Sequence, residues 1–365
     1  MKITRIDLGT LRVPLRAPLK TAVRTVEAVE TVVVSIGTDT GHTGFGEAPA
    51  TAAITGETCG SIVAAIAGVI APRLVGGEID AFNALLQRVD GALAGNSSAK
   101  AAVEIALFDL FAQRHSAPLY RILGGGLPTL STDITISVGP VDAMVADALS
   151  AIDRGYVALK IKLGLDPGTD LDRVRALHDA IGGRARLRLD ANQGWSPKQA
   201  VRTMLGLEAS GIQPELLEQP VPADDLEGLK FVTARIATPV MADESVFGPR
   251  ALLELIRLRA ADIVNIKLMK SGGLSNALRM ADIAALHGMP CMIGCMLESR
   301  ISVTAAAHLA AAKSQAIHYV DLDGPALCAE NPVEGGADFD GPTITLTDAP
   351  GLGITAVAGL QTVGL

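Results

Sequence analysis

Aromatic side chains and an excess of positive charge are both scarce in this sequence of 365 residues. Aromatic residues make up 3% of it, with a single Trp, so the core has to be built mainly from aliphatic side chains. Lys and Arg number 31 against 39 Asp and Glu, which gives a formal net charge of −8. A nucleic-acid-binding protein usually carries a basic patch, and this sequence shows none, so we expect no nucleic-acid partner.

Cysteines and long hydrophobic runs are also scarce. The four cysteines, Cys59, Cys291, Cys295 and Cys328, have no C-x-x-C spacing, which favours reduced thiols over disulfides or a zinc site. The longest apolar stretch, Ile62–Ala71, has about half of the residues that a membrane-spanning helix needs. The sequence starts MKITRIDLGT and shows no apolar run of signal-peptide length. We therefore expect a cytoplasmic protein without a membrane partner.

Aliphatic residues, in contrast, are abundant. Hydrophobic residues make up 49% of the sequence and charged residues 19%, which is ample for a large core. The first ~125 residues have the mixed periodicity of an α+β domain. We expect strands over 3–13 and 31–36, a charged loop over 16–30 between them, and helices over 61–71, 79–93 and 98–115. The glycines at 124–126, followed by Pro128, indicate a domain boundary.

A different rhythm begins near residue 132, where β-branched or Leu-rich runs alternate with Ala-rich amphipathic stretches. Eight runs are strand candidates: 134–138, 158–162, 186–190, 215–218, 239–243, 263–267, 291–294 and 317–321. With seven intervening helical stretches, they predict an α/β fold, a modified (β/α)8-type, TIM-like barrel. The alternative is an open doubly wound sheet with a lid, but no G-x-G-x-x-G opens a helix after a strand.

The pattern predicts three parts of the chain. We expect an α+β capping domain over 1–127 and the barrel catalytic domain over 128–330. The segment 331–365 is rich in Gly, Pro and Thr, and we expect it to form short strands that return to the capping domain.

Charged residues stand at the ends of five successive strand candidates. They are Lys160, Lys162, Asp190, Glu218, Asp243 and Lys267. Each alone is typical of a turn, a helix cap or a solvated strand edge. Five strands in a row that end K-x-K, D, E, D and K predict an active site, because barrel enzymes build their sites from these strand ends.

Three of these residues predict a metal site. The third, fourth and fifth strands are neighbours, so Asp190, Glu218 and Asp243 can converge. Three carboxylates together need a compensating cation, and oxygen ligands with open positions suit Mg²⁺.

The lysines predict proton transfer. The second and sixth strands face one another in a ring of eight, so Lys162 and Lys267 approach a central substrate from opposite sides. A base on each face of one carbon is what inversion of a stereocentre needs. Lys160 shares a face with Lys162, and we expect it to hold a substrate carboxylate and to depress the pKa of Lys162. A metal on that carboxylate stabilises the charge that develops in an enediolate.

In these residues the sequence resembles the enolase superfamily, in its muconate-lactonising subgroup. The matching motifs are Leu159-Lys160-Ile161-Lys162, Asp190-Ala191-Asn192-Gln193-Gly194, Glu218-Gln219-Pro220, Asp243-Glu244-Ser245 and Asn265-Ile266-Lys267. The resemblance spans the whole chain and implies a lysine base with Mg²⁺, the chemistry known for such sites. It also implies that Lys162 acts on the R epimer and Lys267 on the S epimer. The subgroup includes cycloisomerases, succinylbenzoate synthases and acylamino-acid racemases.

Two aspartates restrict the class of substrate that the site could bind. Asp321 and Asp323 end the eighth strand and share a face, across the mouth from the metal. They predict a cation at the far end of the substrate, as in a dipeptide zwitterion. In the dipeptide epimerases that the sequence resembles, an Asp-x-Asp here binds the α-ammonium. The alternative is a plain strand-end turn.

One loop predicts that the substrate carries an acidic side chain. The segment 20–25 resembles the capping loop of L-Ala-D/L-Glu epimerases, where the residue that matches Arg24 binds the glutamate side chain. A guanidinium can hold a carboxylate bidentately, although a solvated loop Arg is the alternative. Thr135 and Cys295 are weaker candidates for substrate contacts or simple lining residues.

The resemblance thus implies a dipeptide epimerase that inverts the α-carbon of the C-terminal residue by two-base proton transfer, with L-Ala-D/L-Glu favoured. Degradation of cell-wall peptides is the expected context, and we expect a homo-oligomer. Glu244 and Glu298 are expected as supporting hydrogen-bonding groups or as structural residues. The alternatives are an N-acylamino-acid racemase or cycloisomerase, and a non-catalytic, metal-dependent ligand-binding protein.

Overall fold

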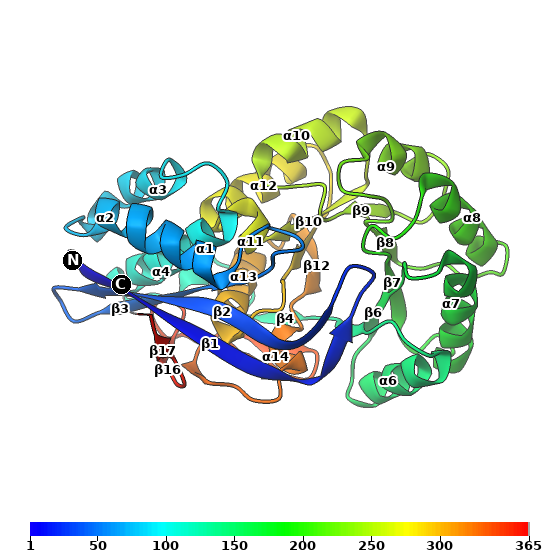
Figure 1. Ribbon diagram of the computed structural model, residues 1–365, viewed down its shortest axis with the longest axis horizontal. Helices are drawn as coiled ribbons and strands as arrows, with labels where there is room; N and C mark the ends of the chain where they lie inside the picture. The colour runs from blue at the N-terminus through cyan, green and yellow to red at the C-terminus, as the bar shows by residue number, and fades with distance from the viewer. Residues whose placement is uncertain (364–365) are drawn as a thin grey trace.

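Eight parallel strands curl into a nearly closed barrel in the computed structural model, which describes residues 1–363 (Figure 1). The strands are β5 (Ile134–Ile136), β6 (Ala158–Lys162), β7 (Arg186–Asp190), β8 (Leu216–Glu218), β9 (Val240–Ala242), β10 (Ile263–Lys267), β11 (Cys291–Gly294) and β12 (Ile317–Asp321). They lie in sequence order from β5 to β12. At the seam, Asp133 N donates to Val320 O at 3.3 Å. The predicted TIM-like α/β fold is confirmed.

Every connection between successive barrel strands contains helix. The helices are α6 (Val141–Asp153), α7 (Pro167–Ile181), α8 (Pro197–Glu208), α9 (Leu226–Thr233), α10 (Pro249–Leu258), α11 (Leu268–Ser271), α12 (Leu274–Leu286) and α13 (Arg300–Ala312). Several begin at a residue whose side chain caps the helix. Ser196, for example, forms a capping box with Gln199 at the start of α8, which satisfies backbone donors that the first turn leaves free.

The strand register brings the charged strand ends to one level. Lys162 pairs with Asp190, and Asp190 pairs with Glu218, in the parallel ladder of β6, β7 and β8. All residues of β6 and β10 are buried, as expected for a parallel sheet covered by helices. The side chains at these strand ends therefore lie inside the protein.

An antiparallel sheet in the order β17-β1-β2-β3 forms the capping region. Its elements are β1 (Ile3–Lys20), β2 (Thr25–Thr38), β3 (Thr43–Pro49), α1 (Cys59–Ala65), the π-helix η1 (Ile66–Ile70), α2 (Ala71–Leu74), the 3-10 helix η2 (Ile79–Ala81), α3 (Phe82–Asp90), α4 (Ser97–Arg114) and α5 (Leu119–Ile122). Helix α4 packs closely on β3. A Cβ at Gly46 would lie 1.8 Å from Ala102 O, so only glycine fits there.

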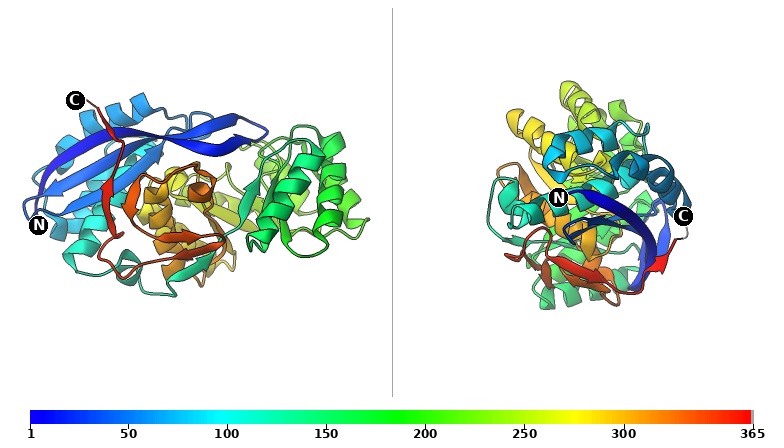
Figure 2. Two further views of the ribbon diagram at one scale, coloured as in Figure 1. Left: turned by 90° about the horizontal axis from the view of Figure 1, so that it is seen from below. Right: turned by 90° about the vertical axis from the view of Figure 1, so that its left-hand side faces the viewer.

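The predicted charged loop over 16–30 is wrong. Strands β1 and β2 form one long hairpin that stays paired out to Lys20 and Thr25, so only the residues between them form its tip. Most side chains near this end are exposed on both faces of the ribbon, which explains why they lack the alternation of a half-buried strand. The tip reaches the barrel mouth (Figure 2), where Val138 N donates to Lys20 O at 3.2 Å.

The C-terminal elements first pair with β4, just ahead of the first barrel strand, and end against the capping sheet. They are α14 (Gly324–Leu327), β13 (Val333–Gly335), β14 (Asp338–Asp340), β15 (Thr343–Thr345), β16 (Ile354–Val357) and β17 (Gln361–Thr362), with β4 (Thr129–Ser131) beside β15. Gly9 of β1 pairs with Thr362 of β17. Residues 364 and 365 of the predicted C-terminal segment lie outside the described residues.

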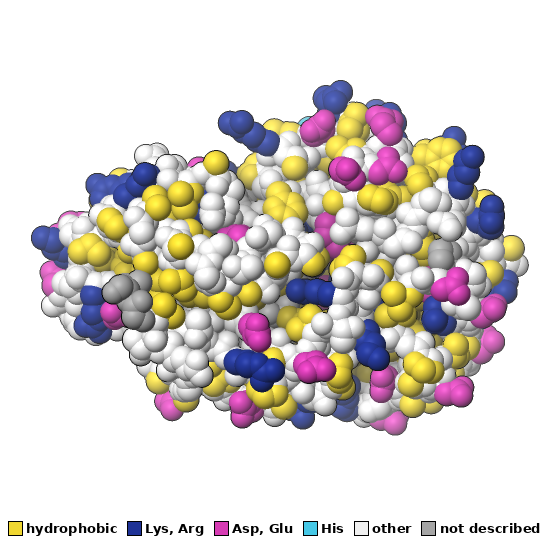
Figure 3. Space-filling view, in the orientation of Figure 1, with side chains coloured by type: hydrophobic (Ala, Val, Ile, Leu, Met, Phe, Trp, Pro, Cys, Tyr) yellow, Lys and Arg dark blue, Asp and Glu magenta, His cyan; other side chains and the backbone are white. Residues whose placement is uncertain are grey.

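Acidic and basic side chains are interspersed over the face shown in Figure 3. Within residues 1–363, we find no helix whose length and apolar character would let it cross a bilayer.

Candidate active site

The strand ends and the β1–β2 hairpin enclose a cavity at the mouth of the barrel. The barrel side contributes Thr135, Lys160, Lys162, Asn192, Asp243, Glu244, Lys267, Cys295, Met296, Leu297, Asp321, Asp323 and Leu327. The capping region contributes Leu19, Thr21, Val23, Arg24 and Ile54. The floor is therefore charged and the cover largely apolar, which suits a small molecule that carries charged groups.

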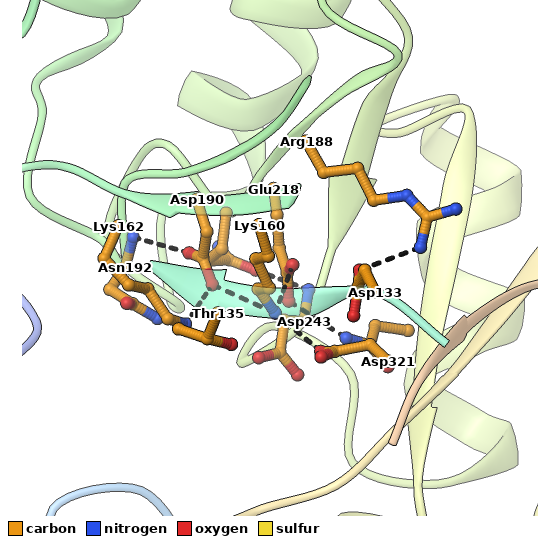
Figure 4. A network of polar contacts seen from close by, with 12 residues as sticks. Asp133, Thr135, Lys160, Lys162, Arg188, Asp190, Asn192, Glu218, Asp243 and Asp321 are labelled. Atoms are coloured by element: carbon orange, nitrogen blue, oxygen red, sulfur yellow. Dashed lines mark hydrogen bonds and ion pairs between the residues drawn. The ribbon is translucent and has the colours of Figure 1, made fainter. Parts of the chain in front are cut away.

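Lys160 lies among three carboxylates (Figure 4). Its Nζ is 3.2 Å from Asp190 Oδ2, 2.7 Å from Glu218 Oε2 and 2.8 Å from Asp321 Oδ2. Burial alone would lower the pKa of Lys160, but the three carboxylates raise it by more than burial lowers it. The net pKa therefore lies well above the usual value. Lys160 is thus a fixed positive charge between neighbouring strands.

Asp243 is held by two other lysines. Lys267 Nζ donates to Asp243 Oδ2 at 2.7 Å, and Lys270 Nζ donates to the Asp243 carbonyl and, at 3.0 Å, to Asn265 O. Burial raises the pKa of Asp243, but Lys267 and then Lys270 lower it by more, and the net pKa lies below the usual range. The carboxylate is therefore ionised and faces the cavity.

Lys162 and Lys267 reach the cavity from different sides. Strands β6 and β10 are four positions apart in the eight-strand order, and both lysines line the cavity. Lys162 Nζ donates to Asp190 Oδ2 at 2.6 Å, whereas Lys267 is anchored on Asp243. Burial lowers the pKa of Lys267, but Asp243 outweighs it and the net pKa is raised. Each amine thus has its own carboxylate to orient it.

The sequence alone indicates no role for four residues that support the carboxylate-bearing residues of the site. Asn192 N donates to Asp190 Oδ1 at 2.9 Å, Asn265 Nδ2 donates to Glu218 Oε1 at 2.9 Å, and Gln219 Oε1 accepts from Asp243 N at 2.9 Å. These three lie inside the strand-end motifs, which is the signal that could have found them. The fourth, Lys270, has no such signal, because its contact depends on the α11 turn.

Unpaired oxygen atoms gather around these carboxylates. Among the described residues, Asn192 Oδ1, Glu244 Oε2 and Asn265 Oδ1 are buried oxygens without a hydrogen bond. Two more buried oxygens, Glu218 Oε2 and Asp243 Oδ1, have no hydrogen bond and contact only the ammonium groups of Lys160 and Lys270. Buried polar atoms are normally satisfied, so such a cluster needs an explanation. Oxygen atoms of this kind are the ligands of hard divalent cations, and the residues present fit Mg²⁺.

The electrostatics of the site agree with this fit. Burial, followed by repulsion from Asp190, raises the pKa of Glu218 to about 7. Burial, followed by repulsion from Asp243, raises the pKa of Glu244 to about 7. Within residues 1–363, no group of three or more acidic, His or Cys side chains is spaced to hold a metal ion in the present arrangement, and the Lys160 ammonium lies between Asp190 and Glu218. The carboxylates are thus already organised around a cation.

The other predicted contact residues line the same cavity. Asp323 Oδ2 accepts a hydrogen bond from Thr135 N at 2.7 Å, and burial with repulsion from Asp321 raises the pKa of Asp323 to about 6. Cys295 is half-buried in the wall, and its pKa is raised well above the usual value, chiefly by burial. All of these side chains converge with Asp321 at one end of the cavity.

Arg24 lies at the hairpin tip and lines the cavity from the capping side. Its backbone N–H donates to Thr21 Oγ1 at 3.2 Å, which shapes the turn. The side chain is half-buried, and burial lowers its pKa while Glu244 partly opposes this shift. No carboxylate within residues 1–363 forms an ion pair with the guanidinium. It is therefore available to an anionic group in the cavity.

The chain is similar to known proteins over almost its whole length. The family model described as mandelate racemase / muconate lactonizing enzyme, N-terminal domain, matches residues 5–124. The model described as enolase C-terminal domain-like matches residues 143–358. An L-Ala-D/L-Glu epimerase from Clostridium acetobutylicum is 52% identical over 357 residues, which cover 98% of this chain and 99% of the relative.

Two solved structures resemble the fold closely. The substrate-liganded L-Ala-D/L-Glu epimerase from Bacillus subtilis has a TM-score of 0.96 at 46% identity, covering 98% of this chain and 100% of that one. The dipeptide epimerase from Enterococcus faecalis, complexed with Mg and L-Leu-L-Tyr, has a TM-score of 0.94 at 39% identity, with the same coverage of 98% and 100%.

Proposed function

Because the chain belongs to the mandelate racemase and muconate lactonizing enzyme group of the enolase superfamily, we propose that it is an Mg²⁺-dependent dipeptide epimerase that favours L-Ala-D/L-Glu. Its relatives are epimerases, so the chain is an isomerase. The observation that carries the proposed mechanism is the placement of Lys162 and Lys267, which reach one cavity from strands four positions apart. A protein that only bound a ligand would not need two opposed bases.

The two lysines invert the α-carbon of the C-terminal residue. One neutral amine removes the α-proton from its face, and the other, as an ammonium, returns a proton to the opposite face. Lys162 serves the R epimer and Lys267 the S epimer. Lys160, held as an ammonium, binds a carboxylate oxygen of the substrate, and the apolar hairpin cover limits access of water to the reacting carbon.

Asp190, Glu218 and Asp243 would hold Mg²⁺. The ion supplies positive charge beside the substrate carboxylate, which stabilises the negative charge that develops when the α-proton leaves. Asn192 and Asn265 orient the carboxylates of Asp190 and Glu218 through the hydrogen bonds described above, and Gln219 holds the backbone of Asp243. Ligands fixed in this way bind metal more tightly.

The remaining contacts set the substrate class. Asp321 and Asp323, beside Thr135 and Cys295, bind the N-terminal ammonium of the dipeptide, and Arg24 binds the side-chain carboxylate of a C-terminal Glu. An N-acyl amino acid or a muconate offers no ammonium for the two aspartates. We further propose a cytoplasmic homo-oligomer in cell-wall peptide degradation, divided into a capping domain (1–127), a barrel (128–330) and a returning C-terminal segment (331–365).

A substrate panel tests this function. Purified protein with Mg²⁺ should epimerise L-Ala-L-Glu and should act far more slowly on N-acetyl-L-Glu, measured by chiral chromatography. Faster racemisation of the N-acyl amino acid would replace the dipeptide assignment with the racemase alternative.

Replacing Arg24 tests the specificity. Arg24→Ala should lower kcat/KM for L-Ala-L-Glu about ten- to a hundredfold more than for L-Ala-L-Leu, because a charge-assisted hydrogen bond contributes ~1.5–3 kcal/mol. Arg12→Ala is the matched control, since Arg12 is an exposed capping-region arginine that pairs with Glu30 at 3.5 Å. An equal loss of kcat/KM on both dipeptides in Arg24→Ala would show that Arg24 does not bind the side chain of the C-terminal residue.

A further inference from the structure

Glu47 is a buried carboxylate of the capping region that reaches a barrel helix. It lies on β3 with no exposed surface. Its carboxylate accepts four hydrogen bonds from two serines of the barrel: from Ser299 N and Oγ at 2.8 Å each, and from Ser302 N and Oγ at 3.1 and 3.0 Å. Both its oxygens are used, so this carboxylate is fully satisfied across the boundary between the two parts of the fold.

The two serines stand at the start of α13. Ser299 is the N-cap residue of this helix. The first N–H groups of a helix have no acceptor within the helix, and its N-terminus carries a partial positive charge that favours an anion. Glu47 therefore completes the end of a barrel helix from outside the barrel.

The same helix start continues into the wall of the active-site cavity. Met296 and Leu297, just before it, line the cavity. Glu298 Oε1 accepts a hydrogen bond from Met296 N at 2.7 Å, and its Oε2 contacts Ser302 Oγ. A chain of contacts thus runs from Glu47 through Ser302 and Glu298 to the cavity wall.

The protonation states along this chain are compatible with one another. Ser302 has a single hydroxyl hydrogen and cannot donate it to both Glu47 and Glu298. Burial, followed by repulsion from Glu47, raises the pKa of Glu298 to about 7. A protonated Glu298 donates to Ser302 Oγ, which in turn donates to Glu47.

We propose that Glu47 is a positioning residue for substrate binding: through Ser299, Ser302 and Glu298 it fixes the segment 295–298 that forms one wall of the cavity. This inference rests on the proposed epimerase function. The segment carries none of the proposed bases or metal ligands. Loss of Glu47 therefore loosens the wall against which the dipeptide packs, and leaves Lys162 and Lys267 on their strands.

Glu104 offers a matched control. It is a buried carboxylate of α4 that accepts from Ser275 N at 2.9 Å, near the start of α12. It too belongs to the capping region and caps a barrel helix. Among the described residues, however, neither Glu104 nor Ser275 lines the active-site cavity.

Kinetics of Glu47→Gln and Glu104→Gln separate positioning from stability. We expect Glu47→Gln to raise KM for L-Ala-L-Glu by at least about tenfold, because the wall against which the dipeptide packs loses its fixed position and each ~1.4 kcal/mol of lost binding is a factor of ten. Its kcat should change much less. Both variants should lose thermal stability, but Glu104→Gln should keep the wild-type KM. An unchanged KM in Glu47→Gln, with kcat falling in step with the folded fraction, would overturn the proposal.

Alkylation of Cys295 gives a readout that does not need turnover. Iodoacetamide should modify Cys295 several-fold faster in Glu47→Gln than in Glu104→Gln or the wild type, as followed by peptide mass mapping. Equal rates would contradict the proposal. If Glu47→Gln does not fold, the same measurements on Ser302→Ala test the proposal, because this change removes the link to Glu298. Ser302→Ala should then raise KM and the alkylation rate of Cys295, as expected for Glu47→Gln.

Different results would refute the epimerase function and the positioning role of Glu47. A wild-type protein that acts on no dipeptide refutes the epimerase function, and Cys295 alkylation still tests the role of Glu47. An active wild type with an unaffected Glu47→Gln refutes only the positioning role.

Discussion

Epimerisation of L-Ala-L-Glu should be lost in both Lys162→Ala and Lys267→Ala. Removal of a general base costs ~10²–10⁴-fold in rate. Lys160 cannot substitute for either lysine, because its Nζ is bound to three carboxylates, those of Asp190, Glu218 and Asp321. The measurement is kcat from chiral chromatography at saturating dipeptide.

The control for these variants is Lys198→Ala, at an exposed lysine of α8. It should keep the wild-type rate. Circular dichroism should show that all three variants are folded, although loss of Lys162 or Lys267 leaves Asp190 or Asp243 less compensated and should lower thermal stability. A variant of either active-site lysine that keeps more than about a hundredth of the wild-type rate would refute the two-base assignment.

Removal of divalent cations should abolish activity, and Mg²⁺ should restore it. Stabilisation of developing charge by a metal is worth several kcal/mol, and each ~1.4 kcal/mol is a factor of ten, so we expect a loss of at least about 10²-fold. Asp190→Asn, Glu218→Gln and Asp243→Asn should each weaken Mg²⁺ binding in calorimetry.

Glu215→Gln is the matched control for the metal site. Glu215 precedes β8, at the far end of the strand from Glu218, and pairs with Arg188 at 2.6 Å and Arg186 at 2.9 Å. Its substitution should leave the Mg²⁺ affinity unchanged. Full activity after exhaustive chelation, with no metal detected by elemental analysis, would contradict the account.

The barrel could be predicted because its strands are buried on both faces. In the run 263–267, Ile263, Val264 and Ile266 are β-branched apolar residues, and all residues of this run are buried in β10. The capping hairpin could not be predicted in the same way. Between Arg16 and Glu30 the ribbon is largely solvated, so this segment resembles a loop in sequence, although Lys20 and Glu30 are paired in the hairpin ladder.

The residues of the candidate site also fall into two groups, those that could be predicted from the sequence and those that could not. Lys162, Asp190 and Lys267 could be found because strand ends in a barrel converge by topology alone. Glu47 and Ile54 could not, because their contacts with the barrel depend on how the capping region docks. Ser299 lies 252 positions from Glu47 in sequence, and no local pattern links the two.

Proton exchange at the α-carbon tests the two opposed bases most directly. Lys162→Ala and Lys267→Ala should each be incubated in D₂O with L-Ala-L-Glu and, separately, with L-Ala-D-Glu, and deuterium at the Glu α-carbon followed by mass spectrometry. We expect that Lys162→Ala exchanges only the L-Glu (S) epimer and Lys267→Ala only the D-Glu (R) epimer, with no epimerisation in either case. If one variant exchanges both epimers, or both variants exchange the same epimer, the two lysines do not act on opposite faces of the substrate.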